Sequence, residues 1–282
     1  MTQDLKKTQF ERRIIFLTLF IVVTLPLIFP LGLKTEITPL VQNAYDMIET
    51  APDSSRIIIS FDYDPSTITE LQPMAQAIIE HCWRRGHKVI ATALWPQGAS
   101  MADAAFSFVI ENGYKDKQYG VDYVNLGYKP GGTVTLQALG RDFQTIFPSD
   151  MKGTPISEIP AMQGIAKLGD IDAVMSLSAG DPGLMAWIMV ASDKYKVKVS
   201  GGTTAISAPG FLTYVNKNQQ LIGLLGGLKA ASEYEKLIGV KGKATVNMDA
   251  QSVAHVLILV FITIGNIKAF RIRRKTRNAQ MN

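Results

Sequence analysis

Residues 14–33 form a run of twenty without a charged side chain, IIFLTLFIVVTLPLIFPLGL. A helix of this length crosses a hydrocarbon core of roughly 30 Å. Basic residues at positions 6, 7, 12 and 13 precede the run, and such residues favour the cytoplasmic side of a membrane. No A-x-A-like cleavage site follows it, so we interpret the run as an anchor rather than a signal peptide. The sequence predicts a cytoplasmic basic N-terminus over 1–13 and a transmembrane helix over 14–33.

A second apolar segment, residues 253–270, is followed by five basic residues within positions 271–277. Its uncharged core is about fifteen residues long, so length alone leaves a buried helix as an alternative. The basic cluster favours a second transmembrane helix with a cytoplasmic basic tail over 271–282. Both termini are then cytoplasmic in a two-span protein of the cell membrane. We expect the intervening domain, residues 34–250, to be extracytoplasmic.

The net charge of +5 is unevenly distributed along the chain. Eleven of the 29 Lys and Arg residues lie before position 35 or after position 267, which leaves 18 basic residues between, against 22 of the 24 acidic residues. A nucleic-acid binder concentrates basic residues on its folded domain. The distribution argues against a nucleic-acid partner and indicates the lipid membrane instead.

The middle of the chain alternates short β-rich apolar runs with helical patterns, which is typical of a parallel sheet covered by helices. We predict an α/β fold, a three-layer sandwich whose mainly parallel, Rossmann-like sheet has about five strands. Helices over about 69–85 and 100–112, ended by Gly86 and Gly113, follow the first two strands. An amphipathic helix over 34–50 and a long helix over about 209–238 complete the domain. The expected strands are residues 56–61, 88–95, 121–127, 171–178 and 196–201.

Few residues suit metal or cofactor chemistry. The single cysteine, Cys82, lies among apolar residues at helical spacing and is interpreted as a buried structural thiol. His81 falls inside an expected helix, His87 precedes a strand, and His255 opens the second span, so none reaches the carboxyl edge of the sheet. No glycine-rich phosphate-binding motif follows the first strand. We therefore expect no metal and no cofactor.

Ligands of open α/β sheets bind beyond the carboxyl ends of the strands. Five such loops supply the candidate ligand-binding residues, which are Asp62, Tyr63, Trp95, Gln97, Tyr128, Lys129, Ser178, Asp181, Ser200 and Thr203. Glycines in these loops leave backbone N–H groups free, so a small anionic ligand is one candidate. Turns and helix caps require the same residue types, and this second interpretation stays open. A Ser-Lys pair, Ser178 or Ser200 with Lys129, is a catalytic alternative.

The first of these loops carries two carboxylates one residue apart, Asp62 and Asp64. The stretch resembles the first motif of haloacid-dehalogenase-like phosphatases, a strand followed by D-x-D-x-T/V. The resemblance covers some ten of 282 residues and implies that Asp62 attacks phosphorus and Asp64 handles the leaving-group proton. The stretch departs from the motif at Ser66 and is followed by helix-capping residues where that family has a flap. The alternative is that Asp64 starts a helix.

Small residues recur four apart at Gly223, Gly227 and Ala231. On one helix they would form a stripe that another backbone can approach closely. Two interpretations follow: the stripe packs on the sheet, or it forms an interface with a second subunit.

Two classes of function fit these observations. We favour a membrane-anchored extracytoplasmic module that binds a ligand or partner and is a non-catalytic subunit of a larger membrane assembly. Its partners would be other membrane proteins or further copies of the chain. The alternative is a membrane-tethered hydrolase, phosphatase- or esterase-like, that uses the strand-end loops.

Overall fold

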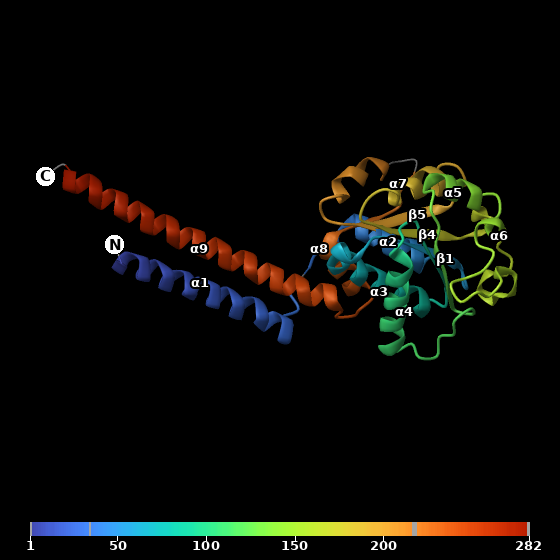
Figure 1. The fold of residues 1–282 in the computed structure, drawn as a ribbon, viewed down its shortest axis with the longest axis horizontal. Helices are drawn as coiled ribbons and strands as arrows, with labels where there is room; N and C mark the ends of the chain where they lie inside the picture. Colours follow the sequence, from blue (N-terminus) through green and yellow to red (C-terminus); the bar gives the residue numbers. More distant parts are fainter. Residues whose placement is uncertain (1, 34, 216–218, 281–282) are drawn as a thin grey trace. The chain divides into compact units, whose positions relative to one another are not determined.

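The computed structural model describes residues 2–33, 35–215 and 219–280 (Figure 1). The chain divides into two compact units. Residues 35–244 form the first, called here the α/β unit, and residues 1–34 with 245–282 form the second, called the helical unit.

The helical unit consists of α1 (Thr2–Ile28) and most of α9 (Lys243–Gln280), which run side by side in opposite directions (Figure 1). Within the described part of the chain, one helix is long and apolar enough to cross a membrane, as judged by length and composition, and it lies in α9 over Lys243–Arg271. The predicted N-terminal span is helical only as far as Ile28. Pro30 explains the early end, because the residue before a proline is pushed out of the helical conformation. Of the two predicted membrane helices, the C-terminal one therefore has the length and apolar composition of a membrane span in the described residues, and the N-terminal one does not meet that criterion.

The α/β unit contains a six-stranded sheet in which every pair of neighbouring strands is parallel. Its strand order is β3-β2-β1-β4-β5-β6. The strands are β1 (Arg56–Asp62), β2 (Lys88–Ala93), β3 (Tyr123–Tyr128), β4 (Ala173–Ser178), β5 (Lys198–Thr203) and β6 (Leu224–Gly226). The predicted α/β class and parallel sheet are confirmed, with one strand more than expected.

Helices cover both faces of the sheet. Alternate residues of a strand point to opposite sides, and here both sets are apolar, so each face is buried under helices. Ile57, Ile59 and Phe61 of β1 join a core with α2 (Pro39–Glu49), α3 (Ile68–Arg84), α4 (Gly98–Glu111) and α8 (Gly227–Leu237). Ile58 points the other way, toward a second core. That core contains residues of α5 (Thr133–Leu139), α6 (Phe143–Ile146), α7 (Leu184–Trp187) and the π-helical turn η5 (Ile188–Ser192).

The helices after β1 and β2, α3 and α4, lie close to the predicted ranges. In the second half of the unit, the helices are shorter than the sequence pattern predicts. Short 3₁₀ turns occupy much of it: η2 (Ile156–Glu158), η3 (Pro160–Met162), η4 (Leu168–Asp170) and η6 (Ala208–Tyr214). One further turn, η1 (Pro65–Thr67), lies in the first half, between β1 and α3.

The predicted long helix over 209–238 is wrong. It is replaced by η6, the short strand β6 and the helix α8, which starts only at Gly227. Gly223 therefore precedes a strand, and the three small residues do not share one helical stripe. A Cβ at Gly223 would lie 2.3 Å from the backbone nitrogen of Ala44, so packing between β6 and α2 requires the glycine. Ala231 is fully buried inside the α/β unit.

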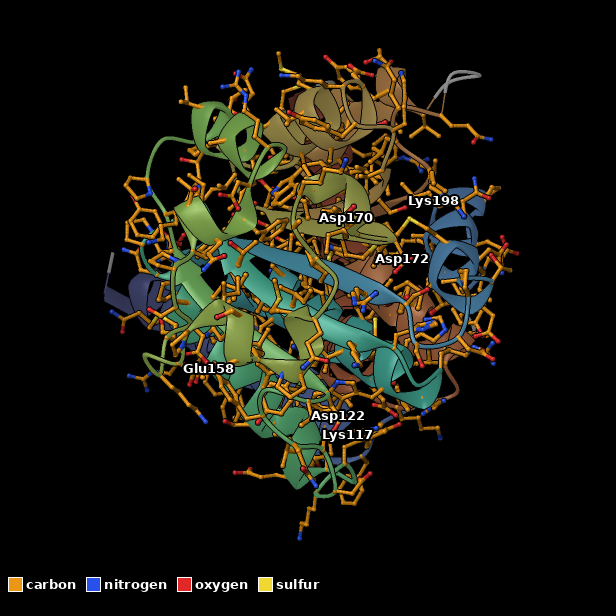
Figure 2. All side chains as sticks on the ribbon, turned by 90° about the vertical axis from the view of Figure 1, so that its right-hand side faces the viewer. Lys117, Asp122, Glu158, Asp170, Asp172 and Lys198 are labelled. Carbon is orange, nitrogen blue, oxygen red and sulfur yellow. The ribbon has the colours of Figure 1, made fainter. Side chains whose placement is uncertain are left out.

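Figure 2 shows the aspartates Asp122, Asp170 and Asp172 near the amino ends of the strands, with the lysines Lys117 and Lys198 on the same face. Their carboxylates hold turns in place. Asp172 accepts from the Arg56 backbone nitrogen at 2.7 Å, and Asp122 accepts from that of Gln118 at 2.8 Å. Asp170 likewise accepts from Ala166 at 2.9 Å. We assign these residues a structural role.

Candidate functional site

The order of the strands locates one position in the sheet at which a ligand can enter. From β1 the chain builds outward through β2 and β3, then returns to place β4 on the other side of β1. The loops after β1 and β4 consequently leave the sheet in opposite directions. Open α/β sheets bind ligands in the crevice that forms at such a point, beyond the carboxyl ends of the strands.

A pocket of about 650 Å³ lies at this edge. It is built from the loops after β2, β3 and β4. Its lining consists of Leu94, Trp95, Pro96, Tyr128, Gly131, Gly132, Thr133, Asp181 and Pro182. Three of the predicted ligand-binding residues, Trp95, Tyr128 and Asp181, are therefore brought together although they come from the ends of three separate strands.

The Trp95 side chain has a fixed orientation at the pocket. Its indole Nε1–H donates to the carbonyl oxygen of Pro182 at 2.7 Å, which joins the loop after β2 to the loop after β4. Gly132 lies against the same loop with a positive φ of 52°. A Cβ there would lie 2.9 Å from the Cβ of Pro182. Both contacts hold the pocket walls together, which favours a preformed site.

Asp62 lies at the end of β1 and is completely buried. Its carboxylate accepts from the Leu94 backbone nitrogen at 2.8 Å and from Ser60 Oγ at 2.8 Å. Ser176 Oγ, on the neighbouring strand, is 3.4 Å away. Burial raises the pKa of Asp62 to about 7, although these hydrogen bonds favour the charged form. The Trp187 indole also favours the charged form but lies outside hydrogen-bond geometry.

Asp64, by contrast, caps the turn that follows β1. Its Oδ1 accepts from the backbone nitrogen of Ser66 at 2.9 Å and from Ser66 Oγ at 2.6 Å. These bonds lower the pKa of the Asp64 carboxyl. The interpretation of Asp64 as the residue that starts a helix is confirmed, because η1 and α3 follow it directly.

The remaining predicted residues lie outside the lining of the pocket. Tyr63 is buried and donates to Gln72 Oε1 at 2.6 Å. Lys129 Nζ lies over the Phe147 ring, 5.4 Å from its centroid. Ser178 Oγ donates to the carbonyl of Gly180 at 2.8 Å. Gln97 is exposed just before α4.

The two candidates on β5 are buried. Ser200 Oγ accepts from the Gly223 backbone nitrogen at 3.1 Å, on the side of the sheet that packs against Met47. Thr203 Oγ1 is buried without a hydrogen-bond partner. The candidate Ser-Lys pairs are not assembled, since Ser200 and Lys129 engage the different groups given above and Ser178 bonds its own loop.

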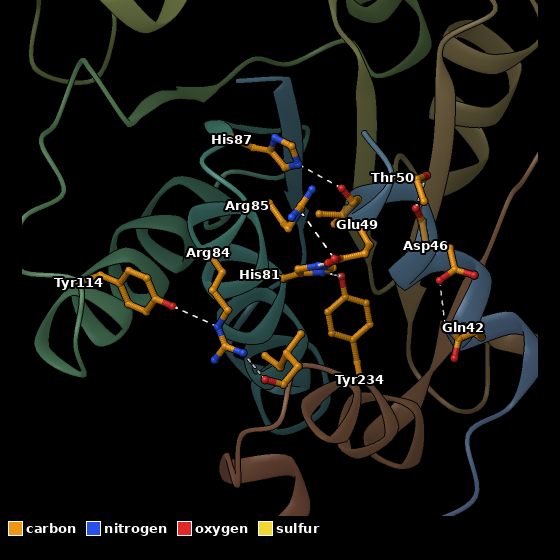
Figure 3. Close-up of polar contacts among 12 residues, drawn as sticks. Gln42, Asp46, Glu49, Thr50, His81, Arg84, Arg85, His87, Tyr114 and Tyr234 are labelled. Carbon is orange, nitrogen blue, oxygen red and sulfur yellow. Dashed lines mark hydrogen bonds and ion pairs between the residues drawn. The ribbon is translucent and has the colours of Figure 1, made fainter. Parts of the chain in front are cut away.

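The histidines lie where the sequence indicated, away from the pocket lining. His81 is buried in α3, with Nδ1 2.8 Å from the hydroxyl of Tyr234 and Nε2 2.8 Å from Glu49 Oε2 (Figure 3). Burial lowers its pKa, and Glu49 opposes this shift. His87 bonds the carbonyl of Ile48 at 3.1 Å. These contacts join α2, α3 and α8 on the first face of the sheet.

Sequence reasoning missed the polar groups that surround Asp62. Ser60 and Ser176 pair across β1 and β4 and point toward the second core, where Trp187 packs. The available signal was Ser60 within the apolar run of β1, two residues before Asp62 and therefore on the same side of the strand. Leu94 and Thr133, which line the pocket, were also missed.

In the described part of the chain, no group of three or more His, Cys, Asp or Glu side chains is placed to hold a metal ion. The arrangement can hold a small molecule against two aromatic rings and one carboxylate. Comparisons of the chain with protein-family models, with curated proteins and with solved structures found no match.

Proposed function

We propose that the protein is a membrane-anchored extracytoplasmic module that binds a small ligand in the crevice beyond β2, β3 and β4. In this proposal it is a non-catalytic subunit of a larger membrane assembly. The observation that carries the proposal is the pocket in which Trp95, Tyr128 and Asp181 meet at the carboxyl edge of a parallel sheet, beside the point where the strand order reverses.

Two contacts within the helical unit support a membrane anchor of two spans. Lys268 Nζ of α9 lies 2.8 Å from Glu11 Oε1 of α1. At the other end of the pair, the Asp249 carboxylate accepts from the backbone nitrogens of Gly32 at 2.8 Å and Leu33 at 3.1 Å. Asp249 and Lys268 are separated along α9 by about 28 Å, at 1.5 Å for each residue. This distance matches the hydrocarbon thickness of a bilayer.

Apolar side chains on both helices are consistent with contact with lipid. Phe16 and Phe20 on α1 are exposed, and so are Leu259 and Ile264 on α9. The helical part of the N-terminal run, residues 14–28, covers about 22 Å, and the five residues that follow the helix can complete the crossing. Basic residues at the open ends of both helices put both termini in the cytoplasm by the positive-inside rule. The α/β unit is then extracytoplasmic.

The hydrolase alternative receives less support from the geometry. A nucleophilic Asp62 would have to reach a phosphorus atom, and its carboxylate is buried behind the Leu94 backbone. Asp64, the proposed proton-transfer group, is occupied as a cap of η1. The proposal of partners in a larger assembly rests on the double anchor alone.

Complementation of a deletion strain tests the proposal. We expect Trp95→Leu to abolish function, because it removes one wall of the pocket and the bond to Pro182. Asp62→Asn and Asp64→Asn should retain function, with all variants compared at equal abundance in the membrane. Loss of function in Asp62→Asn at normal abundance, with Trp95→Leu active, would favour the hydrolase instead.

A further inference from the structure

The charge of the pocket lining indicates what kind of ligand fits. Eight of the nine lining residues are neutral, and the ninth is the carboxylate Asp181. Asp181 lies on the exposed rim, in the loop after β4. No lysine or arginine is among the lining residues. The only side-chain charge on the described walls is therefore negative.

The nearest basic residue in the sequence does not offset this charge. Lys129 directly follows Tyr128, but its ammonium lies over the Phe147 ring rather than in the pocket. Phe147 belongs to the second core, beneath the surface of the unit. The anion that the glycine loops suggested would have to bind beside a carboxylate without a basic side chain to balance it.

The aromatic rings add to the same preference. The face of an indole or phenol ring carries negative electrostatic potential and attracts a cation within about 6 Å of its centre. The Trp95 indole is half-buried, and its N–H edge is bonded to Pro182, so its orientation is set before any ligand arrives. Tyr128 supplies the second ring of the lining.

A second carboxylate lies beneath the pocket wall. Asp62 bonds the backbone nitrogen of Leu94, and Leu94 is itself a lining residue. The hydrogen-bond partners of Asp62 are an amide and two hydroxyls, all of them neutral. Asp62 is fully buried, and burial favours its neutral form, so it supports the Leu94 wall from beneath and the charge that a ligand meets is that of Asp181.

From this combination we infer that the ligand is a small organic cation, such as an alkylammonium compound, held by Trp95, Tyr128 and the Asp181 carboxylate. This inference rests on the proposed function and narrows it to one chemical class. A quaternary or primary ammonium group would lie against the rings and pair with Asp181, while its apolar part contacts Leu94 and Pro96.

Calorimetric titration of the full-length protein in detergent tests the inference. The probes are tetramethylammonium, choline, n-butylammonium and spermidine, with 3,3-dimethylbutan-1-ol as the neutral isostere of choline and inorganic phosphate as the anion. We expect at least one cation to bind, and choline to bind at least 10-fold more tightly than its isostere. Asp181→Asn should weaken cation binding at least 10-fold. Asp53→Asn, which removes an exposed carboxylate at the other edge of the sheet, should leave it unchanged.

Trp95 gives an independent readout. Trp83 and Trp187 are buried, so the change in fluorescence on binding should come from Trp95 and disappear in Trp95→Leu. Thermal unfolding of each variant checks that it is folded, and Tyr128→Phe, which keeps the ring, should retain binding.

The outcomes separate this inference from the proposed function. Suppose that phosphate or the neutral isostere binds and the cations do not, and that this binding is lost in Trp95→Leu. The cation class would then be overturned, and the crevice would remain the binding site. Failure of all four cations to bind would also overturn the cation class. If Trp95→Leu in addition complemented the deletion strain, the crevice itself would be refuted as the site.

Discussion

Replacement of Asp62 by asparagine should change how the stability of the α/β unit depends on pH. The pKa of this fully buried carboxyl is raised from 3.8 to about 7, so folding favours the protonated form. The resulting stability is fully present below pH 3.8 and is lost as the pH rises through 7. Each pKa unit corresponds to 1.36 kcal/mol, so the contribution of Asp62 to the free energy of unfolding should fall by about 4 kcal/mol across this window.

Asparagine resembles the protonated carboxyl in shape and cannot ionise. Its oxygen can accept from the Leu94 amide, and its NH₂ group can donate to the hydroxyls of Ser60 and Ser176. Between pH 4.5 and pH 8 the wild type should therefore lose about 3 kcal/mol of unfolding free energy relative to Asp62→Asn.

Urea unfolding of the full-length protein in detergent measures this difference. All three tryptophans, Trp83, Trp95 and Trp187, belong to the α/β unit, so their fluorescence reports on that unit. Asp64→Asn is the comparison, because the pKa of that carboxyl is lowered by its bonds to Ser66, so its removal should change the pH dependence in the opposite direction. Parallel pH profiles for Asp62→Asn and the wild type would refute the reasoning that burial raises this pKa.

Two further predictions concern packing. Gly223→Ala should lower the free energy of unfolding by about 3 kcal/mol, because its Cβ would clash with the Ala44 backbone, and it should leave the native mass unchanged. Gly169→Ala is the control and should be neutral, because nothing lies within 4 Å of the added Cβ. Cysteines at Glu11 and Lys268 should form an intrachain disulfide on oxidation, seen as a shift in gel mobility, while cysteines at Glu11 and Ser252 should not; crosslinking of both pairs would contradict the paired arrangement of α1 and α9.

The parts of the fold that could be predicted from sequence are those encoded by local patterns. The helix after β1 has a capping aspartate at its start and Gly86 beyond its end, and it formed close to the expected limits. The convergence of Trp95, Tyr128 and Asp181 followed from the rule that parallel strands end at one edge.

Other features depend on contacts between distant segments and left no local signal. The strand β6 is three residues long, and its pairing with β5 overrode the helical spacing of its apolar residues. The burial of Asp62 depends on Leu94 and on the Trp187 side of the second core. The local sequence is the same whether an aspartate at a strand end faces a ligand or is buried beneath the next loop, so the burial of Asp62 could not be predicted from it.

The central claim is that the α/β unit lies outside the cytoplasm between two membrane spans, and cysteine labelling tests it most directly. The native Cys82 is buried and its thiol pKa is raised, so it should not react. A membrane-impermeant maleimide applied to intact cells should label Asp53→Cys, in the α/β unit, and should label Asn282→Cys only after the membrane is permeabilised. In Gram-negative cells the reagent must first be admitted through the outer membrane. Labelling of Asn282→Cys in intact cells, or of Asp53→Cys only after the inner membrane is opened, would contradict the account.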